Sequence, residues 1–133
     1  MKMRNDYVTN SSSSSFVIAK HKDCTMDEIK TMLYGLKDRI KELLHERDGE
    51  YNSNHMIDIK HAYDNNDLDA AIDFVIIDLA GNLNKTSKYD LTLDNWYVRC
   101  TTASNEDSLL FERALYDFGY LMNTEHLKLN SGD

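Results

Sequence analysis

The sequence lacks features that would indicate several common classes of protein. Its 133 residues include no proline, two cysteines and no apolar run of the roughly 20 residues needed to cross a bilayer. Cys24 and Cys100 have no paired spacing, so we predict two buried free thiols in a reducing compartment. The charged residues at the N-terminus are followed by a polar stretch rather than an apolar one. We therefore expect a cytoplasmic protein without a membrane partner.

The motifs of common catalytic, cofactor and metal sites are also missing. With five glycines, the chain has no Gly-x-Gly-x-x-Gly, no phosphate-binding loop and no Gly-x-Ser-x-Gly. The stretch from Asp64 to Asp69 departs from a calcium loop, because Leu68 offers no oxygen and Asp69 replaces the turn glycine. His21 and Cys24 have ligand-like spacing, but no second close Cys or His pair could complete a zinc site. We expect no metal and no cofactor, and a non-enzymatic protein is favoured over an enzyme.

The length and the apolar content of 41% predict a single globular domain covering 1–133. Within it, residues 1–15 form a polar, serine-rich N-terminal arm. The clearest pattern beyond this arm is a helix from Thr25 to Asp48. Thr25 and Glu28 form a capping box, and Gly49 offers a left-handed stop. Its apolar positions recur at steps of three and four: Ile29, Leu33, Leu36, Ile40 and Leu43. We predict that this stripe packs on a sheet, with a homo-oligomer formed through residues 25–48 as the alternative.

The remaining pattern predicts further strands and helices. The elements are a strand at 16–19, a helix at 67–79, a hairpin of 89–93 with 96–102, a helix at 110–121 and a strand at 126–129. Residues 55–63 fit either a strand or a short helix. Residues 104–107 resemble a capping box for the last helix. The fold class is therefore α+β, with about three helices on a small mixed or antiparallel sheet, and an α/β sandwich is the alternative.

The charge is distributed unevenly along the chain. Residues 1–63 carry ten basic and ten acidic residues, whereas residues 64–133 carry five and thirteen, so the net charge of −8 lies in the second part. Residues 64–83 contain five aspartates and no basic residue. Such a segment repels phosphate, which disfavours direct binding of nucleic acid and favours a protein partner with a basic surface.

Candidate contact residues follow from this charge and from exposed aromatic positions. Acidic and tyrosine side chains outside the apolar helix faces are typical of protein-binding surfaces. The predicted partner-binding residues are Asp64, Asp67, Asp69, Asp73, Tyr116, Asp117 and Tyr120. On the predicted helix at 67–79, Asp69 and Asp73 should share the outer face.

A serine run near the N-terminus offers hydroxyl groups for contact or modification: Ser11, Ser12, Ser13, Ser14 and Ser15. Residues 4–16 resemble an N-terminal signature, Thr-Asn-Ser-Ser-Ser-Ser-Ser-Phe after a basic start. It opens many small proteins of unassigned function from low-GC Gram-positive bacteria, their phages and mobile elements. The match covers about a tenth of the chain, and no catalytic residue carries over from it. The resemblance implies a phage or mobile-element origin, in which small acidic proteins include inhibitors of bacterial defence enzymes.

Two functions from different classes therefore stand as hypotheses. The first is a non-enzymatic acidic protein that binds a basic protein surface, such as that of a bacterial defence nuclease. The second is a small enzyme or modified carrier whose chemistry uses residues 11–15.

Overall fold

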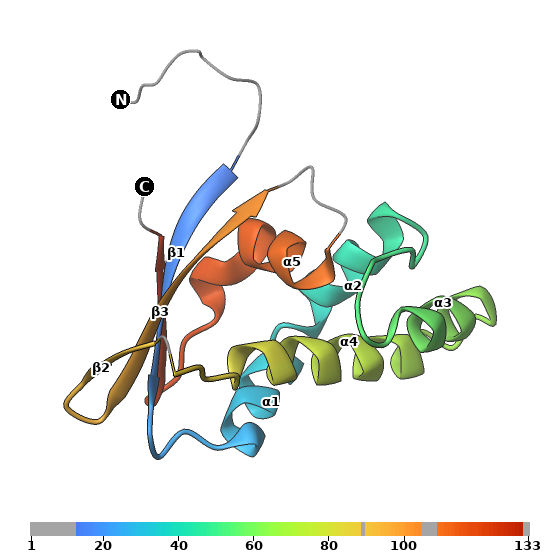
Figure 1. The fold of residues 1–133 in the computed structure, drawn as a ribbon. Helices are drawn as coiled ribbons and strands as arrows, with labels where there is room; N and C mark the ends of the chain where they lie inside the picture. The colour runs from blue at the N-terminus through green and yellow to red at the C-terminus, as the bar shows by residue number, and fades with distance from the viewer. Residues whose placement is uncertain (1–12, 89, 105–108, 132–133) are drawn as a thin grey trace, which may run out of the picture.

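The computed structural model describes residues 13–88, 90–104 and 109–131. At Ser13 and Ser131 it describes the backbone alone. It contains five α-helices, one 3-10 turn and four strands within these residues (Figure 1). In chain order they are β1 (Ser13–His21), α1 (Met26–Tyr34), α2 (Lys37–Glu46), α3 (Met56–Asp64), α4 (Leu68–Leu83), β2 (Leu91–Leu93), β3 (Trp96–Ser104), α5 (Leu110–Phe118), η1 (Gly119–Leu121) and β4 (Leu127–Ser131). The predicted α+β class is confirmed.

The four strands form one open antiparallel sheet in the order β2-β3-β1-β4. β1 is central, because it pairs with β3 on one side and with β4 on the other. The strand is longer than the predicted 16–19, since its backbone pairing begins at Ser13, opposite Ser104. Every described strand pair is antiparallel, which selects α+β over the α/β alternative.

Helices cover one face of the sheet, and none of the described helices covers the other (Figure 1). The buried residues of the sheet share one face in the strand register, so this is the face that packs on the helices: Phe16, Ile18, Ala103, Leu127 and Leu129. Neighbouring positions point to the opposite face, over which no described helix lies (Figure 1). This outer face carries Val17, Ala19, Leu91, Leu93, Trp96, Val98 and Cys100.

The predicted burial of the two thiols is wrong for Cys100. Its position on β3 points to the outer face of the sheet, and its side chain is exposed. Cys24 follows the end of β1 and is half-buried. Both cysteines are free.

The predicted helix at 25–48 is two helices in the structure. The chain turns at Gly35 and Leu36, where the Leu36 amide bonds to the Leu33 carbonyl oxygen in place of a continuing helical ladder. This break lets α1 pack on α4 while α2 packs on both α4 and α5. The predicted apolar stripe serves the internal core: Ile29, Leu33, Ile40 and Leu43 are buried and Leu36 is half-buried. The left-handed stop at Gly49 is confirmed, with φ 76°.

The other sequence predictions have mixed outcomes. Residues 56–64 are helical, which settles the ambiguity at 55–63 in favour of a helix. The hairpin is confirmed by β2 and β3, and the last strand by β4. The final helix begins at Leu110, and its preceding residue Leu109 makes no side-chain cap. Ser104 is the last residue of β3, and the rest of the predicted capping box, 105–107, lies outside the described residues.

Candidate functional site

The longest helix, α4, forms as its sequence pattern predicts. Asp67 caps its start, because the side-chain oxygen accepts the Ala70 amide at 3.2 Å and satisfies a free donor of the first turn. The positions predicted to point inward are buried at Ala71, Ile72, Val75, Ile76 and Leu79, and half-buried at Leu68. These side chains fix the rotation of the helix about its axis. The opposite side of α4 must therefore face solvent.

The exposed side of α4 forms a surface that we call the acidic face, made of Asp69, Asp73, Ile77 and the adjacent Tyr34 of α1. The three α4 residues are four positions apart, and all are exposed. The Tyr34 hydroxyl donates a hydrogen bond to Asp73 at 2.9 Å. This bond raises the pKa of Tyr34. The predicted sharing of one face by Asp69 and Asp73 is confirmed.

Asp64 and Asp78 differ from the two aspartates of the acidic face. Asp64 lies at the end of α3 and pairs with Lys60 at 3.1 Å. It lines an open depression of about 570 Å³, beside the exposed side chains of Met56 and Ile57. Asp78 belongs to the same acidic stretch of sequence, but its side chain is buried and contributes no charge to the surface.

The predicted contact residues of the last helix lie apart from the acidic face. Asp117 accepts a hydrogen bond from Arg113 at 2.8 Å, and Arg113 also pairs with Glu46 of α2. Tyr116 packs half-buried against the core. α5 ends at Phe118, so Tyr120 falls in η1, where it is 62% exposed. The two tyrosines therefore do not form one exposed pair on a single helix.

The serine run lies partly within the sheet. Ser13, Ser14 and Ser15 belong to β1, with Ser14 opposite Ala103 and Ser15 opposite Thr102. Ser11 and Ser12 lie outside the described residues.

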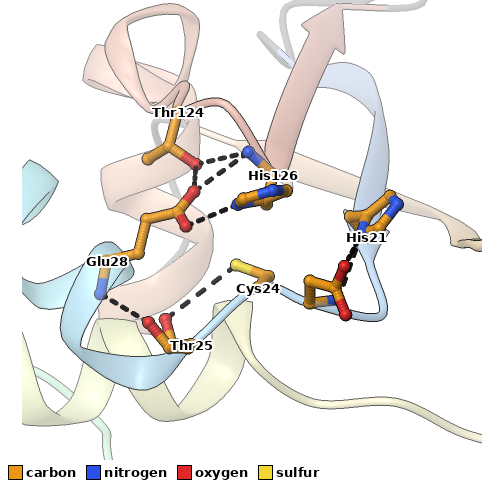
Figure 2. A network of polar contacts seen from close by, with 7 residues as sticks. His21, Cys24, Thr25, Glu28, Thr124 and His126 are labelled. Atoms are coloured by element: carbon orange, nitrogen blue, oxygen red, sulfur yellow. Dashed lines mark hydrogen bonds and ion pairs between the residues drawn. The ribbon is translucent and has the colours of Figure 1, made fainter.

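A polar network joins the start of α1 to the start of β4, as Figure 2 shows. The Glu28 carboxylate contacts His126 Nδ1 at 2.7 Å, accepts the His126 amide at 3.0 Å and accepts the Thr124 hydroxyl. These hydrogen bonds, the one from Thr124 first, lower the pKa of Glu28 to about 2. The contact with Glu28 in turn raises the pKa of His126. The network ties together segments almost a hundred residues apart in sequence.

The network also shows that the predicted capping box is only half formed. Thr25 does accept the Glu28 amide, at 3.1 Å. The Glu28 side chain, however, turns away from the cap to His126 and Thr124 (Figure 2). No local sequence signal reports this pairing, because both partners come from the far end of the chain.

The thiol of Cys24, which is half-buried, lies near this network (Figure 2). Burial is the largest cause that raises the pKa of the Cys24 thiol, and the nearby Glu28 carboxylate raises it further. A raised pKa favours the protonated thiol, which is a poor nucleophile. His21 lies close by, with its ring 5.2 Å from that of His126. The network therefore serves as a structural tie between α1 and β4 in this geometry.

The described part of the chain also bears on metal sites and membrane spans. Within it, no three His, Cys, Asp or Glu side chains gather in a way that could hold a metal ion. No helix there has the length and apolar character of a membrane span. Comparison of the chain with protein-family models, with curated proteins and with solved structures finds no match.

Proposed function

We propose that this protein is a non-enzymatic binding protein whose acidic face engages a basic surface on another protein. The observation that carries the proposal is the pair Asp69 and Asp73. Both are exposed, four residues apart on α4, and no described cationic side chain forms an ion pair with either. By contrast, Asp64 and Asp117 are paired with Lys60 and Arg113.

The mutual repulsion of Asp69 and Asp73 disfavours their spacing in the free chain, whereas the position of Asp69 in the first turn is favoured by the positive end of the helix dipole. Two like charges at a spacing of four destabilise a helix by about 0.2–0.5 kcal/mol. The hydroxyl of Tyr34 satisfies one oxygen of Asp73 but brings no positive charge. A partner that carries Lys or Arg would supply the missing charge and form hydrogen bonds stronger than neutral ones.

The apolar residues of the acidic face add contact area to this charge. Tyr34 is 46% exposed and Ile77 is 41% exposed. Tyrosine is frequent among residues that dominate binding energy, because it combines a large apolar ring with a polar end. The mixture of carboxylates, one tyrosine and one aliphatic side chain therefore matches an interface better than a merely solvated helix side.

The partner that we propose is a basic protein that itself binds nucleic acid, such as a bacterial defence nuclease. A surface built to attract phosphate also attracts a helix that presents aspartates at regular spacing. The excess of acidic over basic residues in 64–133 supports this class of partner, because it draws the chain toward such surfaces over long range. The chain would then act as an inhibitor by occupying the nucleic-acid surface.

The test is capture from a lysate of the native host with three forms of the protein. The forms are the parent chain, Asp69→Lys with Asp73→Lys, and a control, Asp38→Lys with Glu42→Lys. The control pair is exposed on α2, has the same spacing of four and changes the net charge equally. We expect the parent and the control to retain one basic protein that added DNA or RNA displaces, and the first variant to lose it. Retention by all three forms, or a partner that nucleic acid does not displace, would contradict the proposal.

A further inference from the structure

A second feature of the molecule is a cavity of about 310 Å³ between the 52–54 loop, the second half of α4 and the start of α5. Its volume lies at the lower end of the range for small-molecule sites. The polar lining includes Asn52, Asn54, Asp78, Asn82 and Lys85. Phe111 and Leu109 form an apolar part of the wall.

Asp78 makes this cavity different from an ordinary surface hollow. It is the one buried carboxylate among the described residues, with its side chain only 3% exposed. Burying a carboxylate costs several kcal/mol unless charges and hydrogen bonds compensate it. Burial raises the pKa of Asp78, which reports the same penalty.

The compensation that the fold supplies is incomplete. The backbone of Asn54 bonds to the carboxylate. His55 Nδ1 lies 3.8 Å from Asp78 Oδ1, which allows a long ion pair when His55 is protonated but exceeds hydrogen-bond distance, and this buried nitrogen has no hydrogen-bond partner among the described residues. Lys85 lies on the same lining, and its charge lowers the pKa of Asp78 as the smallest of the named causes, but no direct ion pair joins the two side chains in the described structure.

A ligand that completes this site must bring positive charge and N–H donors. A guanidinium group meets both needs, because it is planar, always charged and more weakly hydrated than an ammonium. Two of its N–H groups can bond one carboxylate side by side. The side-chain carbonyls of Asn52, Asn54 and Asn82 offer acceptors for the remaining donors.

We propose that the cavity at Asp78 binds a guanidinium group, with the Asp78 carboxylate as its counter-ion. The group comes either from a free small molecule or from an arginine side chain of a partner protein. This inference goes beyond the proposed function, because none of the lining residues belongs to the acidic face. Either proposal can therefore fail without the other.

The primary test compares ethylguanidine with N-ethylurea, a neutral analogue of nearly the same shape, in NMR titrations of the unmodified protein. We expect saturable shifts of the Asn54, Asp78 and Asn82 amides with ethylguanidine, and at least about tenfold weaker binding of the urea. Equal binding of the two probes, or no saturable shift with either, overturns the proposal. This comparison needs no variant and so does not depend on a mutant's folding.

Two variants then identify the groups involved. Asp78→Asn keeps the side-chain shape and should weaken ethylguanidine binding at least about tenfold. Lys85→Ala removes a competing positive charge and should strengthen binding. Unchanged binding in Asp78→Asn, with a cooperative thermal melt like that of the parent, overturns the role of the carboxylate.

The source of the guanidinium is distinguished with the same assay. Tighter binding of a short arginine-containing peptide than of free arginine supports a partner's side chain. Tighter binding of free arginine supports a small molecule. If neither the peptide nor free arginine binds at the concentrations where ethylguanidine binds, arginine is excluded as the source of the guanidinium group. That result contradicts the proposal.

Discussion

Alanine substitution at two glycines should change stability in opposite directions. Gly49 has φ 76°, in the left-handed region that glycine adopts without strain. A Cβ there would lie 2.8 Å from Cβ and 2.9 Å from Cγ of Tyr63. Gly81 lies within α4, and a Cβ there would meet nothing within 4 Å. The same chemical change therefore strains the first site and fits the second.

The magnitude at Gly49 has two parts. A non-glycine residue in the left-handed region costs roughly 1–2 kcal/mol, and forced overpacking adds about 1–3 kcal/mol. Relief of the clash would move Tyr63, whose hydroxyl contacts His45 Nδ1 at 2.7 Å, and would weaken that contact. Gly49→Ala should thus lower the free energy of unfolding by roughly 2–5 kcal/mol. Gly81→Ala should raise it by about 0.5–1 kcal/mol, because helical glycine carries that entropic penalty.

Thermal melts followed by circular dichroism measure both effects. An unfolding entropy of about 2.1 cal/mol/K per residue gives about 0.28 kcal/mol/K for a chain of 133 residues. Gly49→Ala should then lower Tm by roughly 7–18 °C, and Gly81→Ala should raise it by roughly 2–4 °C. Similar shifts of the same sign in the two variants would refute the assigned conformation at Gly49 and the space around it.

Three further predictions follow from the packing and the polar network. Ile40→Asp should abolish cooperative unfolding, since Ile40 has no exposed surface, whereas Leu36→Asp should leave a measurable transition because Leu36 is only half-buried. In native protein, Cys100 should react quickly with a thiol reagent and Cys24 slowly. The measurement is the number of free thiols left as a function of time, and equal rates would contradict the placement of Cys100 on the outer face. The pair of Glu28 and His126 stabilises the fold most between about pH 4.5 and 6.5. The pKa of Glu28 is lowered in the folded protein, so its contribution to stability is lost as the pH falls toward 2. The pKa of His126 is raised, so its contribution is lost as the pH rises through that raised pKa. The Tm deficit of Glu28→Gln should therefore be larger at pH 5.5 than at pH 8.5, and an equal deficit at both would contradict the ion pair.

Much of the fold could be predicted from local sequence, because the relevant signals act over a few residues. The apolar spacing from Leu68 to Leu79 fixed both the existence and the rotation of α4, so the exposure of Asp69 and Asp73 followed directly. The break at Gly35 was not predicted. The apolar steps of three and four continue through it and outweighed the weak helix propensity of glycine, and the break lets α1 and α2 pack against different neighbours.

The parts of the site that sequence reasoning missed depend on distant contacts. In the sequence, Asp78 is one of five aspartates in an acidic stretch. Its burial arises in the fold, where it lines a cavity together with the 52–54 loop and the start of α5. Glu28 reads as a capping residue, but partners 96 and 98 positions away take its carboxylate. Cys100 reads as a buried thiol, and its exposure depends on which face of the sheet the helices cover. Such features require the assembled structure.

The most direct test of the central claim is the dissociation constant of the captured partner, measured with purified proteins at about 0.05 M and about 0.5 M salt. The account predicts that Asp69→Lys with Asp73→Lys weakens binding at least about a hundredfold at low salt, because each reversal turns an attraction into a repulsion. The dissociation constant of the Asp38→Lys with Glu42→Lys control should stay within a few-fold of that of the parent. This result would exclude the change in net charge as the cause of the weaker binding. Higher salt should weaken the parent complex and shrink the difference between the forms. A first variant that binds as tightly as the control at the low salt concentration would show that the acidic face of α4 is not the binding surface.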